Sequence, residues 1–127
     1  MVGIVVVSHS REIASGTVAL AGQMAGPDVR IQGAGGTPDG GLGTDADRVR
    51  EAIAEADAGD GVIVLGDLGS AFLTARAVLA GQENGHVRLV DAPLVEGAVA
   101  TLVRQAGHAA AERLDRDRAV VAVGPEP

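Results

Sequence analysis

The stretch that decides the fold is Val2-Gly-Ile-Val-Val-Val-Ser-His-Ser-Arg11, at the start of the chain. Its residues are apolar at successive positions instead of alternating, which is typical of a strand buried on both faces. The apolar run stops at Ser8-His9-Ser10, and a helical pattern follows at once. In open α/β sheets, ligands bind at the loops that follow the strands. We therefore predict a strand over residues 2–7 and a candidate functional residue in His9.

The alternation of strand and helix continues along the chain. Further strands are predicted over residues 29–32, 61–65 and 87–90, with an edge strand over 119–123. Helices are predicted over residues 10–25, 44–58, 70–80 and 94–105, with a short helix over 109–114. Short loops between these elements predict an α/β fold with a mainly parallel sheet and right-handed crossovers. We expect one domain over residues 1–123 and a tail or linker start over 124–127.

Helical periodicity predicts which side of each helix faces the sheet. The predicted inward residues are Ile13, Thr17, Leu20, Ala21 and Met24 in the first helix, Ala46, Val49, Ile53 and Ala56 in the second, and Val95, Val99, Leu102 and Ala106 in the fourth. We expect Thr44 or Gly43 to cap the second helix.

Composition narrows the class of protein. The 127 residues are enough for one domain with a core. The net charge is −7, every basic residue is an arginine, and cysteine is absent. Without a basic run or an aromatic platform, a nucleic-acid partner is not expected. The apolar start is too short for a signal peptide, and no apolar run approaches the roughly 20 residues of a membrane span. We expect a cytoplasmic protein.

Asp67 follows the third predicted strand as His9 follows the first. In doubly wound sheets these two strands commonly flank the point where the winding reverses, so both side chains can share one crevice. A carboxylate that accepts a hydrogen bond from one imidazole nitrogen leaves the other nitrogen able to act as a nucleophile. Predicted helix starts at Ser10 and at Gly69-Ser70, and the glycine-rich segment ending at Thr44, surround the pair. Because helix N-termini favour anions, we predict phosphoryl transfer to and from His9.

Simpler interpretations stay open for the same residues. His9 can be incidental, and Asp67 can be only the N-cap of the third helix. The glycine-rich stretch 33–43 is by itself typical of a surface turn. The chain has no lysine and no Walker-type motif, so we do not expect it to hold a nucleotide by itself.

Four segments together resemble a known family. They are Ile-Val-Val-Val-Ser-His-Ser at 4–10, Gly-Thr-Asp at 43–45, Asp-Leu-Gly-Ser-Ala at 67–71 and Ala-Pro-Leu-Val-Glu-Gly at 92–97. In this order and spacing they resemble the mannose-type IIA domains of the bacterial phosphoenolpyruvate-dependent phosphotransferase system. The third and fourth segments match the branch of the family that serves a dihydroxyacetone kinase better than the sugar-transporter branch.

The resemblance implies roles for individual residues and partners. It implies that His9 is the phosphorylated residue, that Asp67 orients its ring, and that Ser10, Thr44, Gly69 and Ser70 bind the phosphoryl group. It further implies HPr as the donor and, as the acceptor, ADP held with Mg²⁺ on a DhaL subunit, which works with DhaK; no cofactor is expected on this chain. The sugar-transporter branch would donate to a IIB domain instead. A three-layer α-β-α fold with an antiparallel edge strand and a homodimer are also implied. Larger members continue into an HPr-like domain, and whether one follows here is left open.

Two other classes of protein compete with this interpretation. Small tetrapyrrole metal chelatases also begin with a strand and a histidine loop, but they need a second ligand, for which His86 is the only plausible residue. His86 precedes the fourth predicted strand, at the wrong end of the sheet. A regulatory α/β module without chemistry is the third possibility, because fold alone does not define function.

Overall fold

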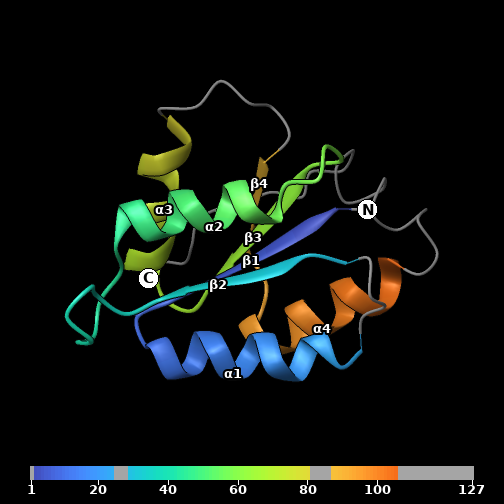
Figure 1. Ribbon diagram of the computed structural model, residues 1–127, viewed down its shortest axis with the longest axis horizontal. Coiled ribbons are helices and arrows are strands. Elements are labelled where there is room, and N and C mark those ends of the chain that lie inside the picture. The colour runs from blue at the N-terminus through green and yellow to red at the C-terminus, as the bar shows by residue number, and fades with distance from the viewer. Residues whose placement is uncertain (1, 25–28, 81–86, 106–127) are drawn as a thin grey trace.

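The computed structural model describes residues 2–24, 29–80 and 87–105 (Figure 1). Its elements alternate strictly, as the sequence predicts. They are β1 (Gly3–Ser8), α1 (Arg11–Gly22), β2 (Ile31–Gly35), α2 (Ala46–Ala56), β3 (Val62–Gly66), α3 (Gly69–Ala80), β4 (Val87–Val90) and α4 (Leu94–Gln105). The predicted short helix 109–114, edge strand 119–123 and tail 124–127 lie outside the described residues.

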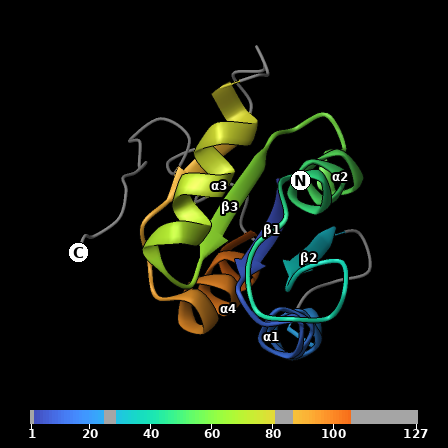
Figure 2. The ribbon, with the colours of Figure 1, turned by 90° about the vertical axis from the view of Figure 1, so that its left-hand side faces the viewer.

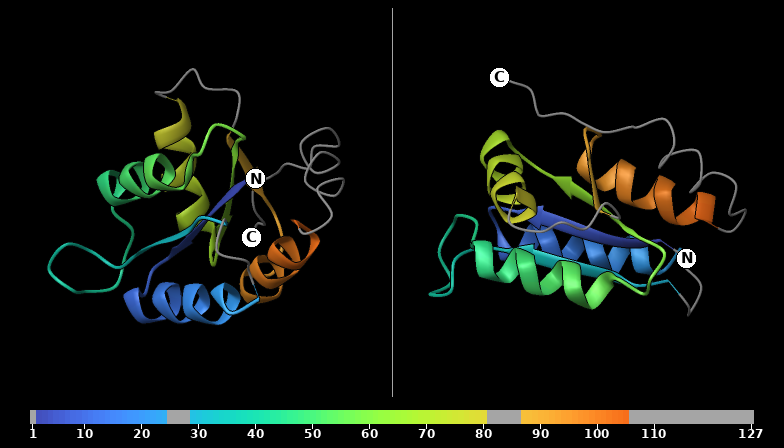
Figure 3. Two further views of the ribbon diagram at one scale, coloured as in Figure 1. Left: turned by 45° about the vertical axis from the view of Figure 1, so that its right-hand side comes forward. Right: turned by 90° about the horizontal axis from the view of Figure 1, so that it is seen from above.

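The four strands form a parallel sheet in the order β2-β1-β3-β4. Helices α1 and α4 cover one face, and α2 and α3 cover the other (Figures 2 and 3). The predicted α/β class with a parallel sheet is therefore confirmed. In this order β1 and β3 are neighbours. The chain continues from β1 outward to β2 on one side and from β3 outward to β4 on the other, so the direction of winding reverses between β1 and β3. None of the helices among the described residues is long and apolar enough to cross a lipid bilayer.

The continuous apolar run of β1 is explained by its central place in the sheet. Val5 and Val7 belong to the core cluster on the α2 and α3 side, whereas Ile4 and Val6 belong to the cluster on the α1 and α4 side. All four side chains are fully buried. Successive strand residues point to opposite faces, so a strand covered on both sides has to be apolar at every position.

The inward face of α1 agrees with the prediction at Thr17 and Ala21 and differs from it at the large residues. The buried residues are Ala14, Thr17 and Ala21, whereas Ile13 and Leu20 are 49% and 46% exposed. The reason is the close approach of β2: a Cβ added at Gly35 would lie 2.5 Å from the Ser10 carbonyl oxygen and 2.7 Å from the Ala14 Cβ. Only small side chains fit between the helix and this strand. Met24, also predicted to face inward, is exposed.

The other helices agree with the predictions more closely. In α2, Val49, Ile53 and Ala56 are buried and Ala46 is partly buried against the same cluster, as predicted. The cap of α2 is Asp45, and not Thr44 or Gly43, because the Asp45 carboxylate accepts the Arg48 N–H at 3.0 Å.

In α4 the fully buried residue is Ala98, Val99 is partly buried, and Val95 is 38% exposed, so the predicted stripe is rotated by one position. Ala106 and the Leu102 side chain lie outside what the structure describes.

Candidate active site at the carboxyl ends of β1 and β3

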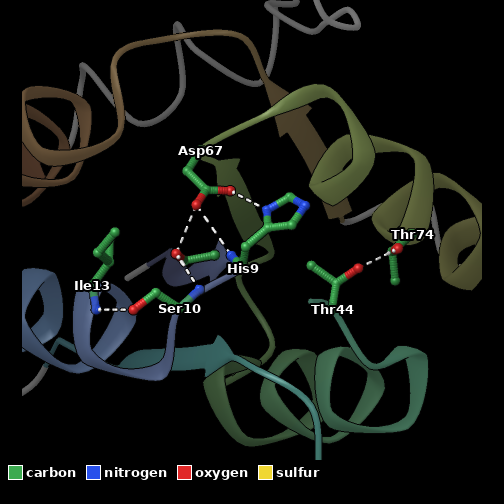
Figure 4. Close-up of polar contacts among 7 residues, drawn as sticks. His9, Ser10, Ile13, Thr44, Asp67 and Thr74 are labelled. Carbon is green, nitrogen blue, oxygen red and sulfur yellow. Dashed lines mark hydrogen bonds and ion pairs between the residues drawn. The ribbon is translucent and has the colours of Figure 1, made fainter. Parts of the chain in front are cut away.

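The site lies where β1 and β3 end side by side. Val7 pairs with Gly66 in the parallel register, and the Asp67 N–H donates to the Val7 carbonyl at 3.1 Å. This bond adds one more backbone hydrogen bond to the β1–β3 pairing, so the residues that follow the two strands lie next to each other. Ser8 and His9 leave β1 at the point where Asp67 leaves β3. The side chains of His9 and Asp67 meet at this edge of the sheet, as the topology predicted (Figure 4).

Asp67 is bound to the β1 end through both carboxylate oxygens. Its Oδ1 lies 3.1 Å from His9 Nδ1. Its Oδ2 accepts the Ser8 hydroxyl at 2.7 Å and the His9 backbone N–H at 3.1 Å. The His9 and Asp67 side chains are 25% and 16% exposed, so the pair is shielded but reachable from solvent. The ring is thereby fixed in place by a carboxylate that is itself fixed.

These contacts set the charge of Asp67. Partial burial by itself would raise the pKa of its carboxyl group, but hydrogen bonds from the Ser8 hydroxyl, the His9 backbone and the His9 ring outweigh it and hold the pKa below its ordinary value. Asp67 is therefore a carboxylate at neutral pH and can only accept hydrogen bonds. The neutral His9 ring must then carry its proton on Nδ1, which leaves the lone pair on Nε2. The ring orientation and the tautomer of His9 are thus both set by Asp67.

The capping interpretation of Asp67 does not fit the structure. The bonds of its side chain run to Ser8 and His9, on the neighbouring strand end. At the start of α3 it is the Leu68 carbonyl that accepts the N–H groups of Ala71 and Phe72, at 3.0 and 3.3 Å.

Ser8 is a member of the site that the sequence analysis missed. It is fully buried, its hydroxyl donates to Asp67, and the same oxygen accepts the Ser10 N–H at 3.0 Å. A buried hydroxyl with both a donor and an acceptor partner holds the β1 end and Asp67 together. Its signal in the sequence was present: a polar residue closes an otherwise apolar strand just before the histidine.

The predicted phosphoryl-binding residues lie around this pair with different local roles. The Ser10 hydroxyl caps α1 by accepting the Ile13 N–H at 3.2 Å. Thr44 precedes the cap of α2, and its hydroxyl lies 2.7 Å from that of Thr74 on α3. Gly69 opens α3, and Ser70 follows it; the Ser70 side chain lies outside what the structure describes.

The glycine-rich loop is connected to the site at one end. The Gly43 N–H donates to the His9 carbonyl at 2.8 Å, which brings the next residue, Thr44, to the histidine loop. Further along, the loop closes on itself, because the Thr37 hydroxyl accepts the Gly41 N–H at 3.0 Å. Gly43 has a φ of 141°, a conformation that side chains rarely adopt. The loop is thus a closed turn whose last residues lie beside the histidine loop.

Metal ligands do not gather in the part of the chain that the structure describes: no three His, Cys, Asp or Glu side chains are grouped there as an ion would require. His86, the second ligand that a chelatase would need, lies outside the described residues.

Comparison with protein families defines the class. The EIIA-man family, described as the PTS system fructose IIA component, matches residues 3–115. This span covers most of the chain, so the chain belongs to the EIIA-man family of phosphotransferase-system domains.

Individual relatives narrow this family to one group, the DhaM subunits. A PEP-dependent dihydroxyacetone kinase phosphoryl donor subunit DhaM of Listeria innocua is 43% identical over 99 residues, which are 78% of this chain and 77% of that protein. The corresponding Lactococcus lactis subunit is 39% identical, over 83% of this chain and 84% of that protein. The Escherichia coli subunit is 42% identical, but the match spans only 24% of its length. The chain is a member of the DhaM group.

Solved structures agree with the fold. A crystal structure of a protein of unknown function, EF1359, has a TM-score of 0.74 and 36% identity, and the match covers 84% of this chain and 85% of that one. The phosphotransferase-system component EIIA of Streptococcus agalactiae has a TM-score of 0.63 over 96% of this chain and 97% of that one. At 16% identity this second likeness concerns the fold alone.

Proposed function

We propose that His9 accepts a phosphoryl group from phosphorylated HPr and passes it to ADP held on a DhaL subunit. The ATP regenerated there would phosphorylate dihydroxyacetone bound by DhaK. The proposal rests on the 3.1 Å contact between His9 Nδ1 and Asp67 Oδ1, which assigns the proton to Nδ1 and makes Nε2 the nitrogen that takes the phosphoryl group. The relatives support the direction of transfer, since they are named phosphoryl donor subunits of PEP-dependent dihydroxyacetone kinases.

The chemistry requires little of the protein beyond position and charge. The lone pair on His9 Nε2 attacks the phosphorus, the new N–P bond forms, and the bond to the donor nitrogen breaks with its electron pair returning to the donor. In the second transfer an oxygen of the terminal ADP phosphate attacks, and the N–P bond on His9 breaks. The ring carries positive charge while phosphorylated, and the adjacent Asp67 carboxylate stabilises that charge.

Backbone N–H groups and hydroxyl groups near His9 can donate hydrogen bonds to the phosphoryl oxygens. The N-termini of α1 and α3 begin at Arg11 and Gly69, immediately after the two strand ends. Backbone N–H groups at helix N-termini and the positive end of the helix dipole favour a dianionic group. Gly69, Ser70 and the hydroxyl groups of Ser10 and Thr44 complete the set that we assign to phosphoryl binding. We propose that nucleotide and Mg²⁺ are bound by the DhaL partner and that this chain works as a homodimer.

The experiment is intact-mass analysis under alkaline conditions after incubation with phosphoenolpyruvate, enzyme I and HPr. We expect the wild type to gain one phosphoryl group and His9→Ala to gain none. His86→Ala and His108→Ala are matched controls that should still be phosphorylated. Equal phosphorylation of His9→Ala would refute the proposal.

The acceptor is tested in a second step. Addition of DhaL loaded with ADP should discharge the phosphorylated chain and produce ATP, whereas a mannose-type IIB domain should not discharge it. Discharge by the IIB domain alone would assign the chain to sugar transport instead.

A further inference from the structure

A pair of threonine hydroxyls joins two walls of the crevice. Thr44 Oγ1, in the segment before α2, lies 2.7 Å from Thr74 Oγ1 on α3, and both residues are half-buried. The two residues are 30 positions apart in the chain. No local sequence pattern marks Thr74, and the two phosphoryl-transfer steps at His9 do not involve it.

The other helical threonines among the described residues show what is unusual here. Thr17 on α1 and Thr101 on α4 each donate to the carbonyl four residues earlier, both at 2.7 Å. This is the common bond of a threonine within a helix. The Thr74 hydroxyl is bound across the fold, to a residue next to the histidine loop.

The pair has one proton more than it uses. Two hydroxyl groups carry two protons, and the bond between them uses one. Among the described residues, neither oxygen has a side-chain hydrogen bond besides this one. One O–H of the pair therefore has no acceptor within the part of the chain that the structure describes, and at a half-buried position it is available to donate to a bound group.

The pair lies on the side of His9 away from Asp67. Figure 4 shows the imidazole between the carboxylate and the two threonines, with its Nδ1 edge toward Asp67. The backbone fixes this arrangement, since the Gly43 N–H binds the His9 carbonyl at 2.8 Å and Thr44 is the next residue. A phosphoryl group on Nε2 would leave the ring at the edge opposite Asp67.

We propose that Thr74 is a positioning residue: its hydroxyl holds that of Thr44 so that the spare O–H of the pair donates to an oxygen of the phosphoryl group on His9. The inference rests on the proposed function and extends the site to α3, which contributes the Thr74 hydroxyl. Hydrogen bonds to charged oxygens are roughly twice as strong as neutral ones, so the pair favours the phosphorylated state and the transfer step that leads to it.

The test uses phosphoramidate, a small phosphoryl donor that needs no partner protein. The rate at which His9 is phosphorylated is followed by intact mass over a series of phosphoramidate concentrations for the full chain. We expect Thr74→Val, which keeps the shape and removes the hydroxyl, to lower the maximal rate about tenfold. Thr74→Ser should restore it to within about twofold of the wild type, because it keeps the hydroxyl. Thr17→Val removes a hydroxyl from another helix and is the control, which should match the wild type.

If the two threonines act together, the effects of the two substitutions on the phosphorylation rate should not add. Thr44→Val should slow the reaction as Thr74→Val does, and the double variant should be no slower than either. Equal rates for Thr74→Val and wild type would overturn the inference, as would a Thr74→Ser variant as slow as Thr74→Val. Melting curves of each variant show whether a slow variant is also unfolded.

Failure of the proposed function has a different signature. If phosphoramidate loads wild-type His9 but phosphorylated HPr does not, the donor is wrong, and the threonine variants still decide the present inference. If phosphoramidate leaves wild-type His9 unmodified, the inference is overturned together with the proposed function.

Discussion

The His9 ring depends on a carboxylate that three hydrogen bonds hold in place. We predict that Asp67→Ala slows phosphoryl transfer to His9 by about 100-fold or more, because the ring loses both its fixed tautomer and the charge that stabilises it. The fold should persist, since the Asp67 backbone N–H still binds the Val7 carbonyl. Rapid-quench measurement of phosphorylation and a far-UV melting curve test the two statements. A transfer rate equal to that of the wild type would show that Asp67 is structural.

The Ser8 hydroxyl makes the largest single contribution to lowering the pKa of the Asp67 carboxyl group. Removal of its hydroxyl in Ser8→Ala takes away a bond that lowers this pKa, while burial, which raises it, remains. We predict a higher Asp67 pKa in Ser8→Ala than in the wild type, measured by NMR titration of the carboxyl carbon. Ser15→Ala, at an exposed hydroxyl that bonds the Arg11 carbonyl, is the matched control. A titration midpoint unaltered by Ser8→Ala would contradict the account.

The lowered pKa of Asp67 also fixes the direction of its effect on stability. A carboxyl group whose pKa is lower in the folded than in the unfolded chain stabilises the fold fully above its ordinary value of 3.8. This stabilisation is lost as the pH falls through the folded-state pKa. The loss should be smaller in Ser8→Ala, whose folded and unfolded values lie closer together.

Among the helices and strands, β2 packs closely on the start of α1, directly after the loop that contains His9. We predict that Gly35→Ala lowers the free energy of unfolding by about 1–3 kcal/mol, because the new Cβ would lie 2.5 Å from the Ser10 carbonyl oxygen. Gly16→Ala, within α1 and with nothing within 4 Å of its added Cβ, should instead stabilise by about 0.5–1 kcal/mol. Urea denaturation measures both. Equal stability of the two variants would show that the close approach has no energetic weight.

The strands and helices differ in how well their burial and caps could be predicted from the sequence. The run Ile4-Val-Val-Val7 predicted a strand covered on both faces, and the structure confirms it. Thr17 and Ala21 of α1 were predicted correctly, but Ile13, Leu20 and Met24 were not, because periodicity favours large residues whereas Gly35 on β2 packs so close that only small ones fit beside it. The Asp45 cap was missed because three residues in a row, 43–45, could each have begun the helix.

At the scale of the whole molecule, the charge of −7 bears on association with partners. We predict that the phosphoryl carrier and the acceptor bring a cation-rich surface to this chain, so that binding weakens as salt rises. Isothermal titration at about 50 and 300 mM salt measures this effect, since the Debye length falls in that range. An affinity independent of ionic strength would contradict the prediction.

Some residues of the site could be predicted from the sequence and others could not. His9 and Asp67 could be placed in one crevice because both follow strands, and the carboxyl ends of neighbouring parallel strands meet at one edge. Ser8 and Thr74 could not be assigned to the site from the sequence, because their contacts depend on side-chain directions and, for Thr74, on the packing of α3 against the segment before α2. The catalytic and binding roles of the residues remain predictions that the experiments above decide.

If Asp67 sets the tautomer of His9, the phosphoryl group must go to one nitrogen of one histidine. Heteronuclear NMR of the phosphorylated, ¹⁵N-labelled chain tests this, because coupling to phosphorus identifies the modified ring nitrogen. We predict phosphate on Nε2 of His9 and a proton on Nδ1 facing Asp67. Phosphate on Nδ1, or on any residue other than His9, would contradict it.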